Sequence, residues 1–378
     1  MNLDKIIYFD NAATTKPDEE VVALYNDIEK NYFGNSSSIH AMGVSSNSLL
    51  NKAEEDILKM LKLAHHKVIF CSCATEANNL AIKGAALKYK NRGMHLITSK
   101  IEHPSVLEAF RQLEKEFGFK VTYLDVNSDG VINIDELKDA MDDEVSIVSI
   151  MAVNNEIGSI NPISEIAEIV HNYPKAILHV DATQAIGKHK LPYNKIDMFS
   201  FSAHKINGLK GSGALIYKDN ISFVPLLSGG KQGHLFRAGT VSVAHACALK
   251  LALEKSLANI DKNLDKITAI CDYIRKELTL EDVEFNSNNL CSPYILNFST
   301  LKKKASVVVE ALSLKGIYVS SVSACNSKFE ASSYVVSNLG KDNKLSSNTI
   351  RLSFSHESTL EEAKRFVSEF KEIMRTIR

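Results

Sequence analysis

The stretch FSFSAHKING, residues 199–208, decides the fold because an apolar run changes directly into chemically capable side chains. The run Asp197–Phe201 predicts a buried strand, and Ser202, His204 and Lys205 follow it. In open α/β sheets, ligands bind beyond the carboxyl ends of the strands. A lysine there can form a Schiff base with an aldehyde cofactor, while a serine and a histidine can hydrogen-bond a phosphate. For Lys205 alone, a solvated surface charge is the alternative.

Short apolar runs alternate with helical patterns on both sides of this stretch. The predicted strands are Lys67–Cys71, Met94–Thr98, Phe119–Leu124, Val145–Val153, Ala176–Val180, Asp197–Phe201 and Ala214–Tyr217. The helical patterns between them are Ala77–Tyr89, Ser105–Phe117, Asp135–Met141 and Ile163–Asn172. This rhythm predicts βαβ units and an α/β fold with a mostly parallel seven-stranded sheet. From about Ser256, two long helical patterns surround a strand at Tyr294–Phe298, which predicts a smaller α+β C-terminal domain.

The composition limits the class of protein. The chain has 378 residues, of which 45% are hydrophobic and 24% charged, as in ordinary globular proteins. A net charge of -1 with mixed signs gives no electrostatic reason to expect direct binding of nucleic acid or an anionic membrane. The sequence shows neither an apolar run of membrane-spanning length nor a signal peptide, and six cysteines are too sparse for a disulfide scaffold. We therefore expect a cytoplasmic protein.

The stretch DVNSDGVINIDE, Asp125–Glu136, matches the twelve-residue calcium loop and suggests a calcium-binding module. A working calcium loop lies between two helices, whereas the entering residues 119–124 alternate apolar and polar side chains, as a strand does. We therefore predict a strand-to-helix turn in which Asn133 or Asp135 caps the helix, and no metal site.

A second strand end, in AILHVDATQAIG (residues 176–187), places Asp181 after a buried run, with Gln184 one turn on. A carboxylate at that depth can pair with a protonated pyridine nitrogen, although an aspartate that caps the next helix is the alternative. Together, Asp181 and Lys205 at two strand ends favour pyridoxal phosphate as the cofactor.

A third strand end, in VIFCSCATEANNLAIKG (residues 68–84), leads into a helix that begins near Thr75. The amide groups of Ala74 and Thr75 and the Thr75 hydroxyl can meet a phosphate at the helix N-terminus. The alternative is that Thr75 and Asn78 are ordinary helix-start residues. In KIEHPSV (residues 100–106), His103 can stack on a pyridine ring or serve as a structural hydrogen-bonding residue.

These motifs, and others in the same order along nearly the whole chain, resemble the cysteine desulfurases of the class V aminotransferase group. The matching motifs are YFDNAATT at Tyr8–Thr15, FGNSSSIH at Phe33–His40, CATEANN at Cys73–Asn79, EHPSV at Glu102–Val106, VNNEIG at Val153–Gly158, HVDATQ at His179–Gln184, SAHK at Ser202–Lys205, RAGT at Arg237–Thr240, SVSACNS at Ser321–Ser327 and TIRLSF at Thr349–Phe354. The resemblance implies the pyridoxal-phosphate-dependent transferase fold type I and a homodimer. It also implies a large cofactor-binding domain at residues 14–255 and a small domain at residues 1–13 and 256–378 that carries a catalytic cysteine loop.

The resemblance also implies the roles of individual residues. The implied catalytic residues are Cys325, Lys205 and His103, and the implied substrate-binding residues are Asn155 and Arg351. The implied cofactor-binding residues are Ala74, Thr75, His103, Asn155, Asp181, Gln184, Ser202, His204, Lys205 and Thr240. Among these, Asp181 binds the pyridine nitrogen, Gln184 the phenolic oxygen, and Thr240 the phosphate of the neighbouring subunit.

Cys325 lies in SVSACNSKFEASS, residues 321–333, a polar stretch of small residues that predicts a mobile loop. A thiolate there can take sulfur from the cofactor-bound substrate and carry it as a persulfide. The alternative is that Cys325 is a buried structural cysteine. That role suits Cys247 and Cys271 better, because both lie in helical patterns. The implied activity converts L-cysteine to L-alanine and passes sulfur to an acceptor protein, either an iron–sulfur scaffold or a tRNA-thiolation enzyme.

The sequence departs from the family pattern where Cys73, Ala203, Lys231 and Val322 replace glycines. The β-branched Val322 disfavours positive φ and would stiffen the loop that carries Cys325. The effect of these replacements on activity is left open, and so are two alternative functions. One is a selenocysteine lyase, and the other is a catalytically weakened paralogue that acts as a binding scaffold.

Overall fold

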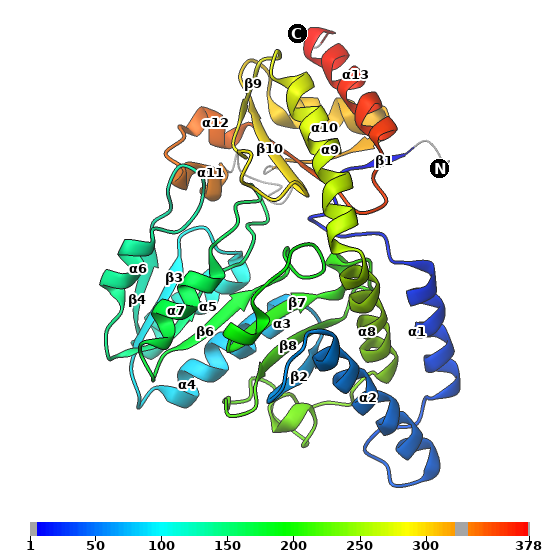
Figure 1. The fold of residues 1–378 in the computed structure, drawn as a ribbon, viewed down its shortest axis with the longest axis vertical. Coiled ribbons are helices and arrows are strands. Elements are labelled where there is room, and N and C mark those ends of the chain that lie inside the picture. The colour runs from blue at the N-terminus through cyan, green and yellow to red at the C-terminus, as the bar shows by residue number, and fades with distance from the viewer. Residues whose placement is uncertain (1–5, 322–331, 377–378) are drawn as a thin grey trace.

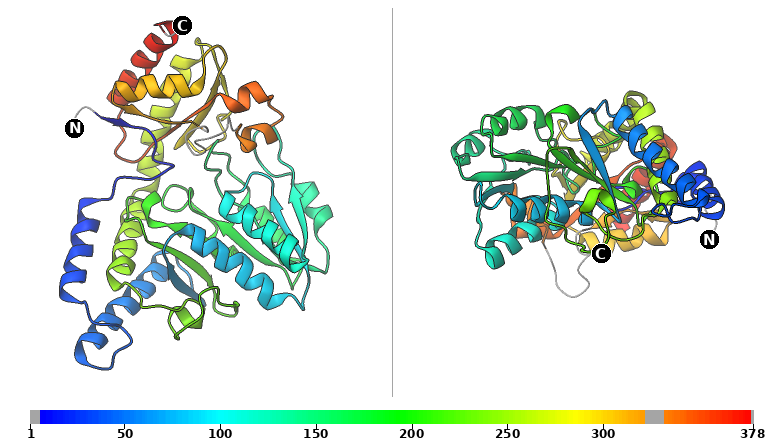
Figure 2. Two further views of the ribbon diagram at one scale, coloured as in Figure 1. Left: turned by 180° about the vertical axis from the view of Figure 1, so that it is seen from behind. Right: turned by 90° about the horizontal axis from the view of Figure 1, so that it is seen from below.

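The computed structural model describes residues 6–321 and 332–376. Within these ranges the chain forms a seven-stranded sheet, a four-stranded sheet and a two-stranded pair. The two larger sheets occupy opposite ends of the molecule, and β1 (Ile7–Tyr8) and α13 (Leu360–Thr376) both lie at the small-sheet end (Figures 1 and 2). No helix in the described ranges is both long and apolar enough to cross a membrane.

The large sheet has the strand order β2-β8-β7-β6-β5-β3-β4. Its strands are β2 (His66–Cys71), β3 (His95–Ser99), β4 (Lys120–Leu124), β5 (Val145–Ser149), β6 (Ile177–Asp181), β7 (Met198–Ser202) and β8 (Gly213–Lys218). Only β8 runs opposite to the other six strands, so the prediction of a mostly parallel seven-stranded sheet is confirmed. The run predicted to Val153 ends as a regular strand at Ser149. Beyond it, the amides of Ile150 and Ala152 still donate to β6 carbonyls, but the chain is already turning.

Helices cover both faces of the large sheet, because alternate strand residues point into two separate cores. On β8, Ala214 and Ile216 belong to one core, and Leu215 and Tyr217 to the other. The first core is covered by α2 (Ala41–Met60), α6 (Ile134–Ala140), α7 (Ile163–His171) and α8 (Val243–Ala258). The second is covered by α5 (Pro104–Phe117) and by one longer helix made of α3 (Ala74–Asn79), the π-helical turn η2 (Leu80–Gly84) and α4 (Ala85–Tyr89). The remaining elements of this part are α1 (Glu19–Asn31) and the 3₁₀ turns η3 (Tyr193–Lys195), η4 (Ala203–Lys205) and η5 (Gly233–Leu235).

The small sheet has the antiparallel order β12-β13-β10-β9, and the N-terminal β1 pairs in parallel with β11 beside it. Its strands are β9 (Val283–Phe285), β10 (Ile295–Thr300), β11 (Ile317–Tyr318), β12 (Ser320–Ser321) and β13 (Thr349–Ser353). The helices of this part are α9 (Ile260–Leu278), α10 (Ala305–Leu314), α11 (Tyr334–Asn338), α12 (Asn343–Ser347) and α13. The core of this part also takes in Ile7, Phe9 and Ala12 from the N-terminal segment. The domain bounds at residues 13/14 and 255/256 stay a prediction.

The calcium-like loop is a strand-to-helix turn, as predicted. It follows β4 rather than a helix, and Asn133 caps α6 by accepting hydrogen bonds from the amides of Asp135 and Glu136. Other loop oxygens are also in use: Asn127 Oδ1 accepts from two loop amides, Glu136 Oε2 accepts from the Asp125 amide at 2.8 Å, and Asp125 Oδ1 pairs with Lys100. Of the two predicted caps, Asn133 is therefore the correct one. Among residues 6–321 and 332–376, no group of three His, Cys, Asp or Glu is placed to hold a metal ion.

Candidate active site

Lys205 ends the 3₁₀ turn η4, which follows β7 without a break. Its Nζ donates hydrogen bonds to the carbonyls of Ala12 and Ala13 at 2.6 and 2.7 Å. Burial, reinforced by the positive charge of Arg351, lowers the pKa of Lys205 to about 8. The sequence alternative of a solvated surface lysine is therefore wrong, because this amine is partly buried and is held by two carbonyls of the N-terminal segment.

Asp181 ends β6, the strand next to β7 in the large sheet. One carboxylate oxygen accepts from the Thr183 amide at 3.0 Å, as the cap alternative required. The other accepts from Asn78 Nδ2 at 2.8 Å, across the sheet edge from the helix that starts at Ala74. With only 5% of its surface exposed, this carboxylate is a buried, fixed negative charge beside Lys205.

A chain of side chains connects Asp181 to His103. Asn78 Nδ2 also donates to Ser105 Oγ at 2.9 Å, and Ser105 Oγ lies 2.8 Å from His103 Nδ1. Burial lowers the pKa of His103, an effect that the nearby Asp181 charge opposes and the Lys205 charge reinforces. The imidazole is therefore a neutral ring at neutral pH, which suits a stacking role.

The alternative that Asn78 is an ordinary helix-start residue is wrong. The helix is preceded by Cys73, which makes no side-chain cap bond, and Asn78 lies in the next turn, fully buried. Its position could have been found from the pattern, because Ala74, Ala77, Asn78 and Ala81 share the buried face of the helix. A polar side chain on such a face needs a polar partner, which here is Asp181.

Two of the predicted phosphate-binding groups, the Ala74 amide and the Ser202 hydroxyl, meet where β7 ends and this helix begins. Ser202 Oγ accepts from the Ala74 amide at 2.6 Å. Gly213, opposite Ser202 on β8, allows this approach, because an added Cβ would lie 2.8 Å from the Cys73 backbone. His204 Nδ1 lies 3.2 Å from Thr14 Oγ1, and burial, with Lys205 and Lys210 nearby, lowers its pKa to about 4.

Two other predicted cofactor residues lie differently. Gln184 is buried and donates through Nε2 to the Ala12 carbonyl at 2.9 Å, the same carbonyl that Lys205 contacts. Thr75 and Thr240 are both exposed. Within one subunit, Thr240 therefore belongs to the surface rather than to the buried cluster.

The predicted substrate residues touch each other: Arg351 comes from the small sheet, and Asn155 lies in a turn beyond the end of β5. Arg351, in the middle of β13, donates through Nη1 to the Asn155 carbonyl at 2.9 Å. Its Nη2 donates to Asp10 Oδ1 at 2.8 Å, an ion pair that the sequence did not reveal. Among the described residues, buried Arg351 Nε and Asn155 Oδ1 find no hydrogen-bond partner. The guanidinium thus keeps unused donor capacity beside an unused amide oxygen.

Known proteins share this architecture. A family profile described as Aminotransferase class-V matches residues 7–366. A protein named NifS/IcsS protein homolog from Lactobacillus delbrueckii subsp. bulgaricus is 38% identical over 376 residues, which cover 97% of each chain.

The chain belongs to the class-V aminotransferase family.

Within this family it groups with the cysteine desulfurases. The protein named cysteine desulfurase IscS from Dictyoglomus turgidum is 38% identical over 94% of this chain and 91% of its own length. A solved structure titled NIFS-LIKE PROTEIN is 32% identical, with a TM-score of 0.91 over 98% of this chain and all of the other. Class-V aminotransferases are pyridoxal-phosphate-dependent as a family.

Three of the replaced family glycines lie in the described part, and their backbones are unstrained. Cys73 has φ −172°, which is extended backbone. Neither Ala203 nor Lys231 has a positive φ. The methyl group of Ala203 is fully buried against Gly208, where an added Cβ would come within 2.7 Å of it. The local backbone therefore gives no sign of a distorted site.

Cys325 and Val322 lie outside the described residues. The described residues on either side of these positions lie next to the predicted substrate residues, however. Ser320 of β12 pairs with Arg351 across the small sheet. On the other side, Ser333 Oγ donates to Glu156 Oε2 at 2.5 Å, one residue from Asn155.

Proposed function

We propose that this class-V aminotransferase is a cysteine desulfurase that converts L-cysteine to L-alanine and keeps the sulfur as a persulfide on Cys325. The observation that carries the proposal is the placement of a partly buried Lys205 and a buried Asp181 at neighbouring strand ends, within reach of each other's charge and of the charge of Arg351. The titles of relatives support the substrate. One solved relative, titled "SspA in complex with cysteine", is 30% identical with a TM-score of 0.79 over 92% of this chain and 98% of the other.

Pyridoxal phosphate fits the residues that are present. Lys205 would hold its aldehyde carbon, Asp181 its ring nitrogen and Gln184 its phenolic oxygen, while the neutral His103 would stack on the ring. Ala74 N, Ser202 Oγ and His204 form the phosphate end, where the amides at a helix start favour an anion. When bound, the cofactor supplies an electron sink that stabilises negative charge on the substrate Cα.

The chain's own groups then have distinct tasks. Arg351 binds the substrate carboxylate with the donor capacity that it does not spend on Asp10 and Asn155. Lys205 moves the Cα proton, since an amine with a pKa of about 8 can accept and return a proton near neutral pH.

Sulfur transfer needs no external oxidant. The thiolate of Cys325 forms a bond to the substrate sulfur while the carbon–sulfur bond breaks. The electron pair of the broken bond stays with the carbon fragment, which takes up a proton and leaves as alanine. The products are a Cys325 persulfide and alanine, so one enzyme thiol and one cysteine account for every atom.

The same proposal includes a homodimer. Five large apolar side chains are exposed within residues 32–44, namely Tyr32, Phe33, Ile39, Met42 and Val44. Large exposed apolar patches are uncommon on monomers and mark interfaces. A second subunit on this surface would shield them, and it would give the exposed Thr240 a phosphate to contact. We place the enzyme in the cytoplasm, with an iron–sulfur scaffold or a tRNA-thiolation enzyme as the sulfur acceptor.

The decisive experiment follows the sulfur. Purified protein loaded with pyridoxal phosphate should release alanine from L-cysteine, and mass spectrometry should find one added sulfur on the peptide that contains Cys325. Cys325→Ala should keep the cofactor but lose alanine release by orders of magnitude, because the attacking thiolate is gone. Cys291→Ala, a partly exposed thiol at the surface, is the matched control and should turn over normally.

Two outcomes would redirect the proposal. Normal turnover by Cys325→Ala would remove this residue as the sulfur carrier. Release of alanine from selenocysteine but not from cysteine would make the protein a selenocysteine lyase.

A further inference from the structure

Lys188 is a buried lysine that the mechanism above does not use. Only 8% of its surface is exposed, and it lies in the turns that follow β6, four residues after Gln184. Lysine is seldom buried without a paired acid. In the part of the chain that the structure describes, Lys188 makes no ion pair. Its Nζ donates to Gln184 Oε1 at 3.1 Å and lies 5.8 Å from the centre of the Tyr294 ring.

The contacts of Gln184 fix which way its amide group faces. The Ala12 carbonyl can only accept a hydrogen bond, so the atom 2.9 Å from it must be the Gln184 nitrogen. The lysine amine donates to the other end, which must then be the oxygen. Two independent partners, the Ala12 carbonyl and the Lys188 amine, therefore specify the same orientation.

The hydrogen bonds form one continuous path. It runs from Lys188 to Gln184, from Gln184 to the Ala12 carbonyl, and that carbonyl also accepts from Lys205 at 2.6 Å. A terminal side-chain amide has a broad, nearly two-fold torsion, so losing the partner on its oxygen would leave the Ala12 carbonyl as the one contact that specifies the orientation. Turned over, Gln184 would present an oxygen to Ala12 and to any neighbouring anion.

We propose that Lys188 is a positioning residue that holds the Gln184 amide with its NH₂ group turned toward Lys205 and the phenolic oxygen of pyridoxal phosphate. This proposal rests on the proposed function. Lys188 itself touches neither cofactor nor substrate and acts through Gln184.

The protonation state of Lys188 does not limit this role. Burial, together with the charges of Lys205 and Arg351, lowers its pKa to about 7. Both the ammonium and the neutral amine carry N–H groups, so the bond to Gln184 Oε1 is available on either side of that pH.

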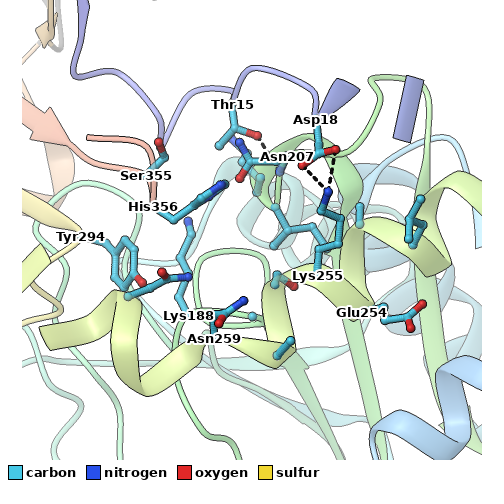
Figure 3. A pocket seen from close by; sticks show the side chains of 18 of the residues that line it. Thr15, Asp18, Lys188, Asn207, Glu254, Lys255, Asn259, Tyr294, Ser355 and His356 are labelled. Carbon is cyan, nitrogen blue, oxygen red and sulfur yellow. Dashed lines mark hydrogen bonds and ion pairs between the residues drawn. The ribbon is translucent and has the colours of Figure 1, made fainter. Parts of the chain in front are cut away.

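The surroundings of Lys188 make the test practicable. Lys188 and Lys205 both line a cavity of about 460 Å³, in which Figure 3 shows Lys188 close to Tyr294. A shorter or apolar side chain at position 188 therefore adjoins existing space, and water can enter where the amine is removed.

The test is a double-mutant cycle of Lys188→Met and Gln184→Ala, read first by titrating pyridoxal phosphate into the cofactor-free protein. Lys188→Met should weaken binding about 10-fold, the order expected for one hydrogen bond to a charged oxygen. In the Gln184→Ala background, the same substitution should change the affinity less than about twofold, because the group that Lys188 positions is absent. Lys190→Met, an exposed lysine two residues on, is the matched control and should bind like the wild type.

The visible absorption of the bound cofactor is the second readout. The pH at which this band changes should rise in Lys188→Met, since the phenolate would lose a donor, and it should stay unchanged in Lys190→Met. A role of Lys188 in packing alone would lower the melting temperature and leave this pH unmoved.

The possible outcomes distinguish a failure of the positioning role from a failure of the proposed function. Equal losses in the wild-type and Gln184→Ala backgrounds, or an affinity and band unchanged in Lys188→Met, would overturn the positioning role alone. Wild-type protein that takes up no pyridoxal phosphate would overturn the proposed function and this inference with it. If Lys188→Met does not fold, Lys188→Ala replaces it in the cycle with the same expected losses, because its missing side chain opens onto the cavity.

Discussion

The two halves of the candidate site are built in different ways. On the cofactor side, Lys205, Asp181 and Ser202 stand at the ends of adjacent strands of one sheet, and each already has a hydrogen-bond partner. On the substrate side, Arg351 reaches across from the second sheet, shares its charge with Asp10, and has a buried Nε without a partner among the described residues. The cofactor side is thus preorganised, whereas the substrate side has donor capacity left for an incoming carboxylate.

This difference follows from how each side is positioned. Neighbouring strands fix their ends through the register of the ladder, so Asp181 faces Ser200 and Ser202 faces Gly213 at set spacings. Arg351 depends on contact between two sheets with separate cores. A substitution on the cofactor side should therefore remove one group and leave the rest of the site in place. A substitution on the substrate side should mainly change the affinity for the substrate.

The largest expected effect is on the cofactor side. Lys205→Ala should abolish alanine release and the visible absorption of covalently held pyridoxal phosphate together, because it removes the desolvated amine at the strand end. Absorption spectra and an alanine assay on the same preparation check this. Lys195→Ala, an exposed lysine paired with Glu168, should behave as wild type. A Lys205→Ala protein that keeps both properties would refute the role of Lys205.

The positions of the cofactor-side residues could be predicted from the sequence because they depend on local patterns. Lys205 and Asp181 each follow a buried apolar run, and the strand-end rule needs nothing more. The bond between Asn78 and Asp181 joins residues 103 positions apart, and no local pattern states such a pairing. Asp10 was missed for the same reason, since its partner Arg351 lies 341 positions away. Lys188 was missed because one lysine in a polar turn looks solvated until the fold buries it.

A smaller effect is expected on the substrate side. Arg351→Lys should raise KM for cysteine about 10- to 100-fold with a lesser change in cofactor affinity, because lysine cannot offer the guanidinium fork to a carboxylate. For 2-aminoethanethiol, which lacks the carboxylate, the wild type and the variant should have the same KM. Steady-state kinetics with both thiols measure how much the substitution changes KM for each of them. Arg275→Lys, whose guanidinium bonds two backbone carbonyls in the small domain, is the control. An equal rise in KM for both thiols would show that Arg351 does not bind the carboxylate.

A third expected effect concerns stability rather than catalysis, at a carboxyl group between the two halves. Glu102 is fully buried, its Oε1 accepts from Ser99 Oγ and the Met151 amide, and its carbonyl accepts from Tyr334 of α11. Its Oε2 has no partner among the described residues. Burial raises the pKa of Glu102 to about 8, against the hydrogen bonds from Met151 and Ser99 and with help from the Asp181 charge.

Folded Glu102 therefore keeps its proton up to about pH 8, while the unfolded chain releases it near the ordinary glutamate pKa of 4.5. The stability that this proton provides is complete below pH 4.5 and declines as the pH rises toward 8, because the unfolded state then binds fewer protons than the folded state.

Glu102→Gln has no proton to lose. Relative to wild type, it should gain stability between pH 5 and pH 8, by an amount on the order of a few kcal/mol. Urea unfolding of the cofactor-free proteins at both pH values measures this change. Glu108→Gln, an exposed carboxyl of α5 paired with Arg111, should show no such trend. A Glu102→Gln curve parallel to wild type would mean that the carboxyl is already ionised in the fold, and that the boundary between the two halves tolerates a buried charge.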